Sequence, residues 1–371
     1  MALPALTLSF AAQEFDVGAE RIGIVLTAYI VGMAAVSVPS GIIGDRIGPS
    51  KVLAAFFWVL GLGAVACSFA QDFWQLLAAH ALLGVGAGLF HPAALGLVSL
   101  SVEPAKLGRA MGAFGLVGGL GWFSVPILMR LPMGWRAGFL VIAGASVLGA
   151  IVCHVLMSRG ALLGGPAPPA PARSTDRRGS AGRLLLVGLL IAMGSNAFLL
   201  DGFLPMFPEV VSGLGTWVVQ EQMLVASIMA IGAVGQYVGG ILARDVFASS
   251  RFAVLLVIQP LTLLSLAHSL DEPAWPFMLM GSFAFMNFMT QPIENKLLAT
   301  FTSARRRSTA YALKFVVALL IAAPAPMLVS GLYSAEGWSF EAIFRLLALT
   351  GMVGVFAGYV FLKQSRGVAR A

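Results

Sequence analysis

Charged residues are scarce in this chain of 371 residues. Only 11% are Asp, Glu, Lys or Arg, whereas about a quarter of the residues are charged in a typical soluble domain. The apolar fraction is 59% and the mean hydropathy is +0.91. This composition excludes a soluble globular domain, whose surface needs far more charge. It predicts an all-α, polytopic membrane protein that lies in a lipid bilayer.

Cysteine and histidine are also rare. Cys67 and Cys153 are single thiols within apolar runs, so the sequence offers no disulfide framework and no pair at metal-ligand spacing. The histidines are scattered and lack the HExxH spacing of a zinc site. No nucleophile–base grouping is visible either. We therefore predict no metal, no cofactor and no enzyme activity.

One glycine run could be mistaken for a nucleotide-binding loop. In Gly84-Val-Gly86-Ala-Gly88-Leu89, however, Leu89 stands where the third glycine belongs, and no strand precedes the run. We interpret these glycines as helix-packing residues. No ATP site is visible in the sequence.

The basic residues of the chain, with a pI of about 9.8, indicate membrane topology rather than nucleic-acid binding. They fall in short turns between apolar runs and form no continuous face. Most of them lie on the side of the turn at 44–51. The positive-inside rule therefore predicts that this turn and the carboxyl terminus are cytoplasmic.

Twelve apolar runs approach or reach the roughly 20 residues that cross a hydrocarbon core. They cover residues 1–13, 22–43, 52–70, 73–100, 108–130, 137–158, 184–207, 221–243, 251–270, 274–300, 309–332 and 341–362. The run 1–13 is short and has no charged n-region, so it does not indicate a signal peptide. Leu3-Pro4 matches Leu204-Pro205, which ends a full span. We therefore expect a truncated first helix, with roughly 15 to 20 preceding residues absent.

Residues 159–183 are rich in proline, alanine, glycine and serine and cannot bury a core. We expect a mobile cytoplasmic linker there. It divides the chain into an N-terminal bundle at 1–158 and a C-terminal bundle at 184–362, followed by a cytoplasmic tail at 363–371.

An internal repeat relates the two parts. The sequence around His91-Pro92, HPAALGLVSLSVEPAKLGRAMGAF, corresponds to QPIENKLLATFTSARRRSTAYALKF around Gln291-Pro292, at an offset of 200 residues. Gly41 likewise recurs as Gly240. These matches predict two six-helix bundles related by a parallel internal repeat.

The turn between the spans 22–43 and 52–70 reads Gly41-Ile-Ile-Gly-Asp45-Arg46-Ile-Gly48-Pro49-Ser50-Lys51. A carboxylate at a buried helix end, such as Asp45, needs a cationic or helix N-terminal partner. The turn resembles the signature of the major facilitator superfamily, G-x-L-A-D-R-x-G-R-K/R-x-x-L. The residues in register are Gly41, Asp45, Arg46, Gly48, Lys51 and Leu53. Gly44, Pro49 and Ser50 depart from the signature, and a generic positive turn is the alternative.

This resemblance implies a secondary active transporter of the bacterial inner membrane. Such a protein moves a small-molecule substrate by alternating access, with its site between the bundles near mid-membrane. Protons are the expected driving ion, and a monomer without nucleic-acid partners is expected. Asp45 would latch the cytoplasmic ends of the bundles near Thr309. Residues 89–94 and 134–137 resemble bacterial drug-resistance and anion-permease members.

Two questions stay open in this interpretation. Val125-Pro126 stands where the antiporter motif has Gly-Pro, so antiport is less well indicated than transport. A facilitator-like protein that has lost transport and acts as a sensor or membrane scaffold is the alternative function. The sequence gives neither the substrate nor the direction of transport.

Ionisable residues inside the spans are functional candidates, because a charge in lipid is costly unless it faces a cavity or a partner. They are His80, His91, Asp201, Glu294, Lys296 and Lys314. Glu294 shares one helical face with Asn287 and Gln291, at positions i, i+4 and i+7. We expect Lys314 to pair with Glu294 on the substrate or proton path. A static ion pair between spans ten and eleven is the alternative.

Three further residues carry narrower expectations. Asp201 precedes Pro205, so a broken helix end would place its carboxylate in the cavity mouth as a proton-coupling acid or as a cap. His91 is a possible cavity residue, although the small residues on its helical face also fit close helix packing. Lys296 lies on a different face from Glu294 and is expected to snorkel toward the cytoplasm.

Overall fold

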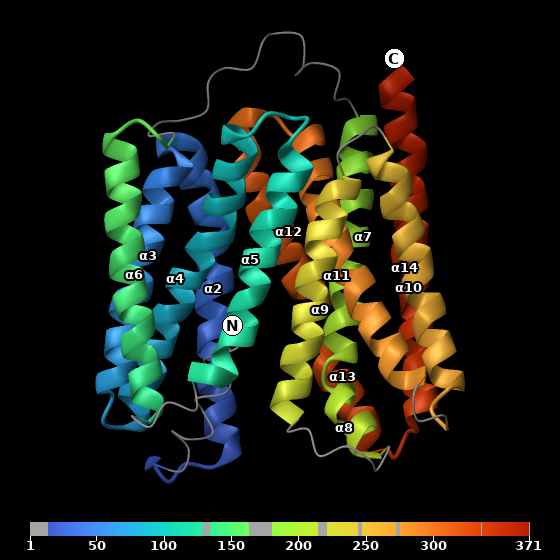
Figure 1. The fold of residues 1–371 in the computed structure, drawn as a ribbon, viewed down its shortest axis with the longest axis horizontal. Coiled ribbons are helices and arrows are strands. Elements are labelled where there is room, and N and C mark those ends of the chain that lie inside the picture. The colour runs from blue at the N-terminus through green and yellow to red at the C-terminus, as the bar shows by residue number, and fades with distance from the viewer. Residues whose placement is uncertain are drawn as a thin grey trace. The chain divides into compact units, whose positions relative to one another are not determined.

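The computed structural model of the chain describes residues 14–128, 134–162, 180–213, 221–243, 247–271, 275–334 and 336–370. Within these ranges the chain is helical and contains no strand (Figure 1). The elements are α2 (Ala19–Ile47), α3 (Pro49–Phe69), α4 (Phe73–Ser101), α5 (Leu107–Leu128), α6 (Trp135–Ser158), α7 (Ser180–Phe203), α8 (Met206–Gly213), α9 (Glu221–Leu242), α10 (Ala248–His268), α11 (Trp275–Phe301), the 3-10 turn η1 (Ala304–Arg306), α12 (Arg307–Ala322), α13 (Pro324–Ser334) and α14 (Phe340–Arg370). The all-α prediction is confirmed for this part of the chain.

The predicted spans from 22–43 onward each overlap a helix whose bounds differ by a few residues. Among the described residues, 8 helices are long and apolar enough to cross a membrane. The predicted first span, 1–13, and most of the predicted linker, 159–183, lie outside the described residues.

Two of the predicted spans are not continuous helices. The structure divides both into two helices, because α7 ends at Phe203 before α8, and α12 ends at Ala322 before α13. Pro205 and Pro324 lie at the two breaks. Proline lacks the N–H group that a helix interior needs, and its ring clashes with the preceding turn. The break near Pro205 agrees with the broken helix end expected after Asp201, whereas no break was expected near Pro324.

The helices group into two compact units. The first contains Met1–Ser101, Ser124–Ala170 and Thr302–Val316, and the second contains Val102–Phe123, Pro171–Phe301 and Val317–Ala371. Each unit therefore includes one segment from the other side of the predicted linker. The division into spans one to six and seven to twelve stays a prediction.

In the first unit, α2 lies along α4, and α3 packs against both α4 and α6 (Figure 1). Glycines bring α4 close to α2. A Cβ atom at Gly84 would lie 2.1 Å from the backbone oxygen of Tyr29, and one at Gly88 would lie 2.5 Å from that of Met33. The two backbones therefore touch where side chains are missing, as is common between membrane helices.

In the second unit, α9 lies along α11, and α14 packs against α10 and α7 (Figure 1). Aromatic rings join three of these helices. The ring centroid of Phe203 on α7 lies 4.7 Å from that of Phe283 on α11 and 6.3 Å from that of Phe344 on α14. All three side chains are fully buried, so aromatic packing forms the core of this unit.

Helix α5 meets α9 along a stripe of glycines in the second unit. A Cβ atom at Gly108 would lie 2.7 Å from the backbone oxygen of Gly240, and one at Gly119 would lie 2.3 Å from the Cβ atom of Ala233. Gly112 lies between them on the same helical face. The contact therefore depends on the absence of side chains along this face of α5.

Replacing Gly112 by alanine should destabilise the second unit. The new Cβ atom would meet backbone atoms only, with the Cα of Gly240 at 2.8 Å and the oxygen of Gln236 at 2.9 Å. Overpacking of this kind costs about 1–3 kcal/mol. A Cβ atom at Gly118 on the same helix would have no atom beyond its own stretch of helix within 4 Å. Gly118→Ala should therefore be neutral or stabilise by up to about 1 kcal/mol. Thermal unfolding of the detergent-purified variants should show a lower Tm for the first variant only. Equal Tm values would contradict the glycine contact.

Candidate functional site

Gly48 closes the turn between α2 and α3. Its φ of +102° lies in the left-handed region that favours glycine, and its N–H group donates to the oxygen of Gly44 at 2.9 Å. Pro49 then opens α3 at a position where a missing N–H group is tolerated. The proline that replaces a basic residue of the family signature therefore starts the next helix.

Asp45, in the last turn of α2, caps the first turn of α12. Its Oδ1 accepts a hydrogen bond from the N–H group of Ser308 at 2.9 Å, and its Oδ2 accepts from the N–H group and the hydroxyl of Thr309 at 3.0 and 2.6 Å. The first N–H groups of a helix lack partners within the helix and carry partial positive charge. The contact expected near Thr309 is present, and a helix N-terminus serves as the partner of the carboxylate. We call this contact the Asp45 latch.

The start of α12 fits into a slot that glycines leave open. A Cβ atom at Gly41 would lie 2.7 Å from the backbone oxygen of Ser308, and one at Gly96 would lie 2.5 Å from its Oγ atom. Ser308 is fully buried, and its hydroxyl has no hydrogen-bond partner among the described residues. A buried hydroxyl without a hydrogen-bond partner destabilises the contact between Asp45 and the start of α12. The side chains of Arg46 and Lys51, by contrast, are exposed.

A second set of polar side chains is buried in the second unit, between α7, α10 and α11. Its members, which we call the amide network, are Asn196, Gln259, Asn287, Thr290 and Glu294. Asn196 Nδ2 lies 2.8 Å from Thr290 Oγ1 and 3.4 Å from Glu294 Oε1. Asn287 Nδ2 donates to the backbone oxygen of Asn196 at 2.9 Å and to Gln259 Oε1 at 2.8 Å. Glu294, only 2% exposed, thus lies beside the amide group of Asn196.

The amide network includes only part of the polar face predicted for α11. Asn287 and Glu294 belong to it, whereas Gln291 is half-buried and lies outside it. Sequence reasoning missed Thr290 and Gln259. The sequence indicates both, because Thr290 lies one helical turn before Glu294, and Gln259 is a polar residue in a mostly apolar run.

His91 and Lys314 belong to the first unit. The His91 ring on α4 stacks on Phe315 of α12, with ring centroids 4.7 Å apart and an interplanar angle of 25°. Both His91 and Lys314 are half-buried. Glu294 lies in the second unit, so its pairing with Lys314 stays a prediction.

Lys296 caps the end of α9. Its ammonium group donates to the backbone oxygen of Ala243, and Arg251 donates to that of Leu242. A helix C-terminus carries partial negative charge, which these two cations stabilise. The expected snorkelling of Lys296 toward the cytoplasm stays a prediction.

Asp201 lies in the last turn of α7, just before the break at Pro205. It is half-buried, and within the part of the chain that the structure describes its carboxylate makes no hydrogen bond or ion pair. In the same described ranges, no three His, Cys, Asp or Glu side chains are placed to hold a metal ion.

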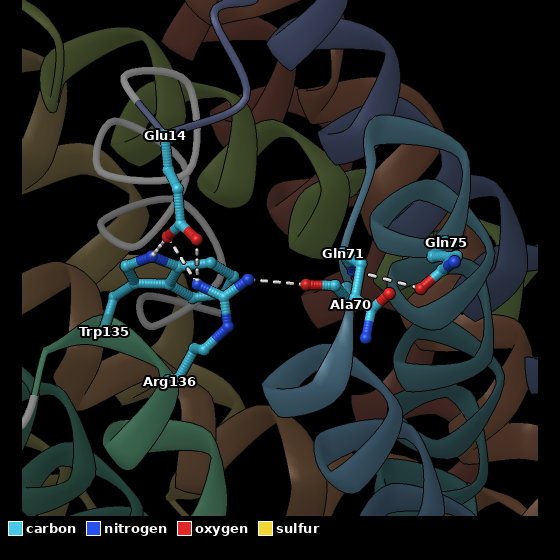
Figure 2. Close-up of polar contacts among 6 residues, drawn as sticks. All are labelled: Glu14, Ala70, Gln71, Gln75, Trp135 and Arg136. Carbon is cyan, nitrogen blue, oxygen red and sulfur yellow. Dashed lines mark hydrogen bonds and ion pairs between the residues drawn. The ribbon is translucent and has the colours of Figure 1, made fainter.

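Figure 2 shows a further polar cluster in the first unit, where α3 ends and α6 begins. The Glu14 carboxylate accepts hydrogen bonds from Trp135 Nε1 at 2.8 Å and from the Arg136 guanidinium, which also donates to the oxygen of Ala70 at 2.6 Å. The hydrogen bond from Arg136 holds the pKa of the Glu14 carboxyl below its usual range. This Glu14 tie fixes the segment before α2 to α3 and α6. Sequence reasoning did not predict this contact.

The sequence matches the Major Facilitator Superfamily over residues 1–326. It is 27% identical to the riboflavin transporter RibZ of Clostridioides difficile (strain 630) over 133 residues, which are 35% of this chain and 29% of RibZ. It is 24% identical to a probable sugar efflux transporter of Helicobacter pylori (strain G27) over 285 residues, 72% of this chain and 68% of that protein. The chain spans less than a third of the length of the first curated relatives that it matches.

The fold is similar to that of solved transporters. The crystal structure of the E. coli fucose:proton symporter FucP matches with a TM-score of 0.72 and 12% sequence identity, over 97% of this chain and 95% of FucP. At this identity the likeness shows the fold alone.

Two variants should change the stability of the Asp45 latch in opposite directions. Asp45→Asn removes hydrogen bonds to a charged acceptor, which contribute about 1.5–3 kcal/mol when buried and roughly 1 kcal/mol at this partly exposed position. Ser308→Ala removes the hydroxyl that lacks a partner and should therefore stabilise the latch. Thermal unfolding should give a lower Tm for the first variant and a higher Tm for the second. A shift in the same direction for both would contradict the described contact.

The Glu14 tie should depend on pH. Because the folded pKa is lowered, the tie contributes stability above the ordinary pKa of glutamate and loses it as the pH falls through the lowered value. Glu14→Gln should therefore lower the stability at neutral pH by roughly 0.5–1 kcal/mol, since the pair is partly exposed. Its Tm should converge with that of the unmodified protein in acid. Glu103→Gln, which removes an exposed pair with Lys106, is the control and should change the Tm little at any pH. A constant difference between Glu14→Gln and the unmodified protein would exclude this role for the carboxylate.

Proposed function

The chain belongs to the major facilitator superfamily, and on that premise we propose that it is a secondary active transporter. It moves a small organic solute by alternating access and is driven by the proton gradient. The proposed location is the bacterial inner membrane, with the α2–α3 turn and the carboxyl terminus in the cytoplasm. The family match over residues 1–326 is the observation that carries this proposal.

Alternating access requires two bundles that rock against each other. Two glycine contacts support the internal repeat that predicts these bundles. A Cβ atom at Gly41 would lie 2.8 Å from the Cβ atom of Ala312, and one at Gly240 would lie 2.7 Å from the Cα atom of Gly112. The repeat found in the sequence maps Gly41 onto Gly240 and Ala312 onto Gly112. Equivalent residues of the predicted halves therefore make equivalent contacts, each within its own unit.

The Asp45 latch supports a gating step at the cytoplasmic ends of the bundles. In the proposed division, α2 belongs to the N-terminal bundle and α12 to the C-terminal bundle. Water can replace both sides of the contact when it opens, because a carboxylate and the N–H groups of a helix start are readily hydrated. The latch is thus suited to repeated opening, and the Ser308 hydroxyl favours release.

Proton coupling needs a carboxylate that can change its charge within the membrane. Glu294 and Asp201 are two described carboxylates inside spans, and buried ionisable groups of this kind mark proton and substrate pathways in transporters. FucP, whose fold is similar, is named as a proton symporter. These observations support proton-driven transport.

The function can be tested in proteoliposomes that contain a pH-sensitive dye. Addition of the transported solute should move protons across the vesicle membrane, and a panel of vitamins, sugars and organic acids is a suitable first screen. Folded protein that gives no proton or solute flux with any compound would overturn the proposal and favour a sensor or membrane scaffold.

Glu294 and Lys314 should be coupled in stability. Glu294→Gln or Lys314→Met would each leave one charge without its opposite, whereas the double variant removes both, so the effects should deviate from additivity by about 0.5–3 kcal/mol. A double-mutant cycle of Tm values measures this coupling. Additive effects would exclude the pair.

The same variants distinguish a role on the transport path from a purely structural role. If Glu294 and Lys314 lie on the transport path, the double variant should be folded but inactive in the vesicle assay. Transport at the original rate would make the pair purely structural.

A further inference from the structure

Within the amide network, Asn196 directs its side-chain amide at Glu294. We propose that Asn196 is a positioning residue that holds Glu294 as a carboxylate. This inference rests on the proposed function, in which Glu294 lies on the substrate or proton path. The inference follows from the direction of the hydrogen bonds in the amide network. Two contacts, one at each end of the network, determine this direction independently.

Gln259 fixes the first end. Its Nε2 donates to the backbone oxygen of Leu255 at 3.2 Å, and a carbonyl oxygen can only accept. Its Oε1 therefore faces Asn287, which must turn its Nδ2 toward Gln259, at 2.8 Å. Reversed amides would place two oxygens, or two N–H groups, against each other.

Thr290 fixes the other end. Its single hydroxyl hydrogen is donated to the backbone oxygen of Asn287 at 2.6 Å, so its oxygen can only accept from the Asn196 side chain. The Asn196 atom that lies 2.8 Å from this oxygen must therefore be Nδ2. The Oδ1 of Asn196 then faces the Nδ2 of Asn287 at 3.1 Å. Both ends thus require the same orientation of every amide.

This orientation leaves one N–H group of Asn196 for Glu294, 3.4 Å away. An N–H donor stabilises a carboxylate, whereas a protonated carboxyl would have to turn its O–H group away from Asn196. The Oδ1 of Asn287 is left without a hydrogen-bond partner among the described residues. The orientation that Gln259 and Thr290 fix thus leaves one acceptor without a partner and directs an N–H donor at Glu294.

A charge swap tests the orientation. Asn196→Asp puts a second carboxylate beside Glu294 and should lower the Tm of the purified protein by several degrees. Asn196→Asp/Glu294→Gln moves the single carboxylate to α7, where the Nδ2 of Asn287 already points, and should restore most of the loss. A Tm unchanged by Asn196→Asp, or a double variant no more stable than the sum of its single changes, would overturn the proposal.

Infrared spectroscopy gives a readout that altered packing alone would not produce. At neutral pH, Asn196→Leu should increase the absorption band of protonated buried carboxyl groups, because Glu294 loses the N–H donor that Asn196 supplies. The added band should vanish in Asn196→Leu/Glu294→Gln. An unchanged band in Asn196→Leu would count against the positioning role.

Thr262→Val is the matched control. Thr262 is a largely buried polar residue on α10 whose hydroxyl donates to the oxygen of Ile258 within its own helix, so its loss should leave the carboxyl band unchanged. An equal rise in this control would assign the effect to general loosening and overturn the inference. Neither measurement needs a solute. A protein without transport would refute the proposed function alone, whereas a transporting protein without charge-swap rescue would refute this inference alone.

Discussion

A polar group buried among apolar membrane helices has to find its partner within the protein, because the hydrocarbon around it offers none. In this chain the ends of helices supply many of these partners. Asp45 is satisfied by the first N–H groups of α12, and Lys296 by the last carbonyl groups of α9. Such contacts require backbones to come very close, and glycines such as Gly41 and Gly112 permit this approach. The scarcity of charge and the abundance of glycine in the sequence thus have a common physical reason.

The two buried polar clusters are built differently, and the difference suits separate tasks. The Asp45 latch joins a carboxylate to a helix terminus, and water can replace either side when the contact opens. The amide network joins side chains from three helices, and these side chains are buried. Its members therefore keep the same partners. In a transporter the first arrangement suits a gate that opens in every cycle. The second suits a group whose geometry and charge have to persist.

Most helices and the partner of Asp45 could be predicted from the sequence, because apolar length and a family signature report on them directly. The break near Pro205 could also be predicted from that proline, whereas the break near Pro324 was not. Proline alone does not specify a break, because Pro92 and Pro292 lie inside continuous helices. The amide network could not be predicted. Asn196 and Asn287 are separated by 91 residues, and their contact depends on how the helices rotate about their axes, which apolar runs do not specify.

The proposal that the Asp45 latch opens and closes during transport can be tested with one reversible cross-link. Helix α2 contacts η1, and the exposed residues Ile47 and Arg306 lie on these two elements. The measurement uses Ile47→Cys/Arg306→Cys in a chain whose two native cysteines are replaced by serine, joined by a cleavable thiol reagent. Solute-driven proton flux in vesicles should stop when the cross-link forms and return when it is cleaved. Flux at the full rate with the cross-link in place would contradict a gate at this contact.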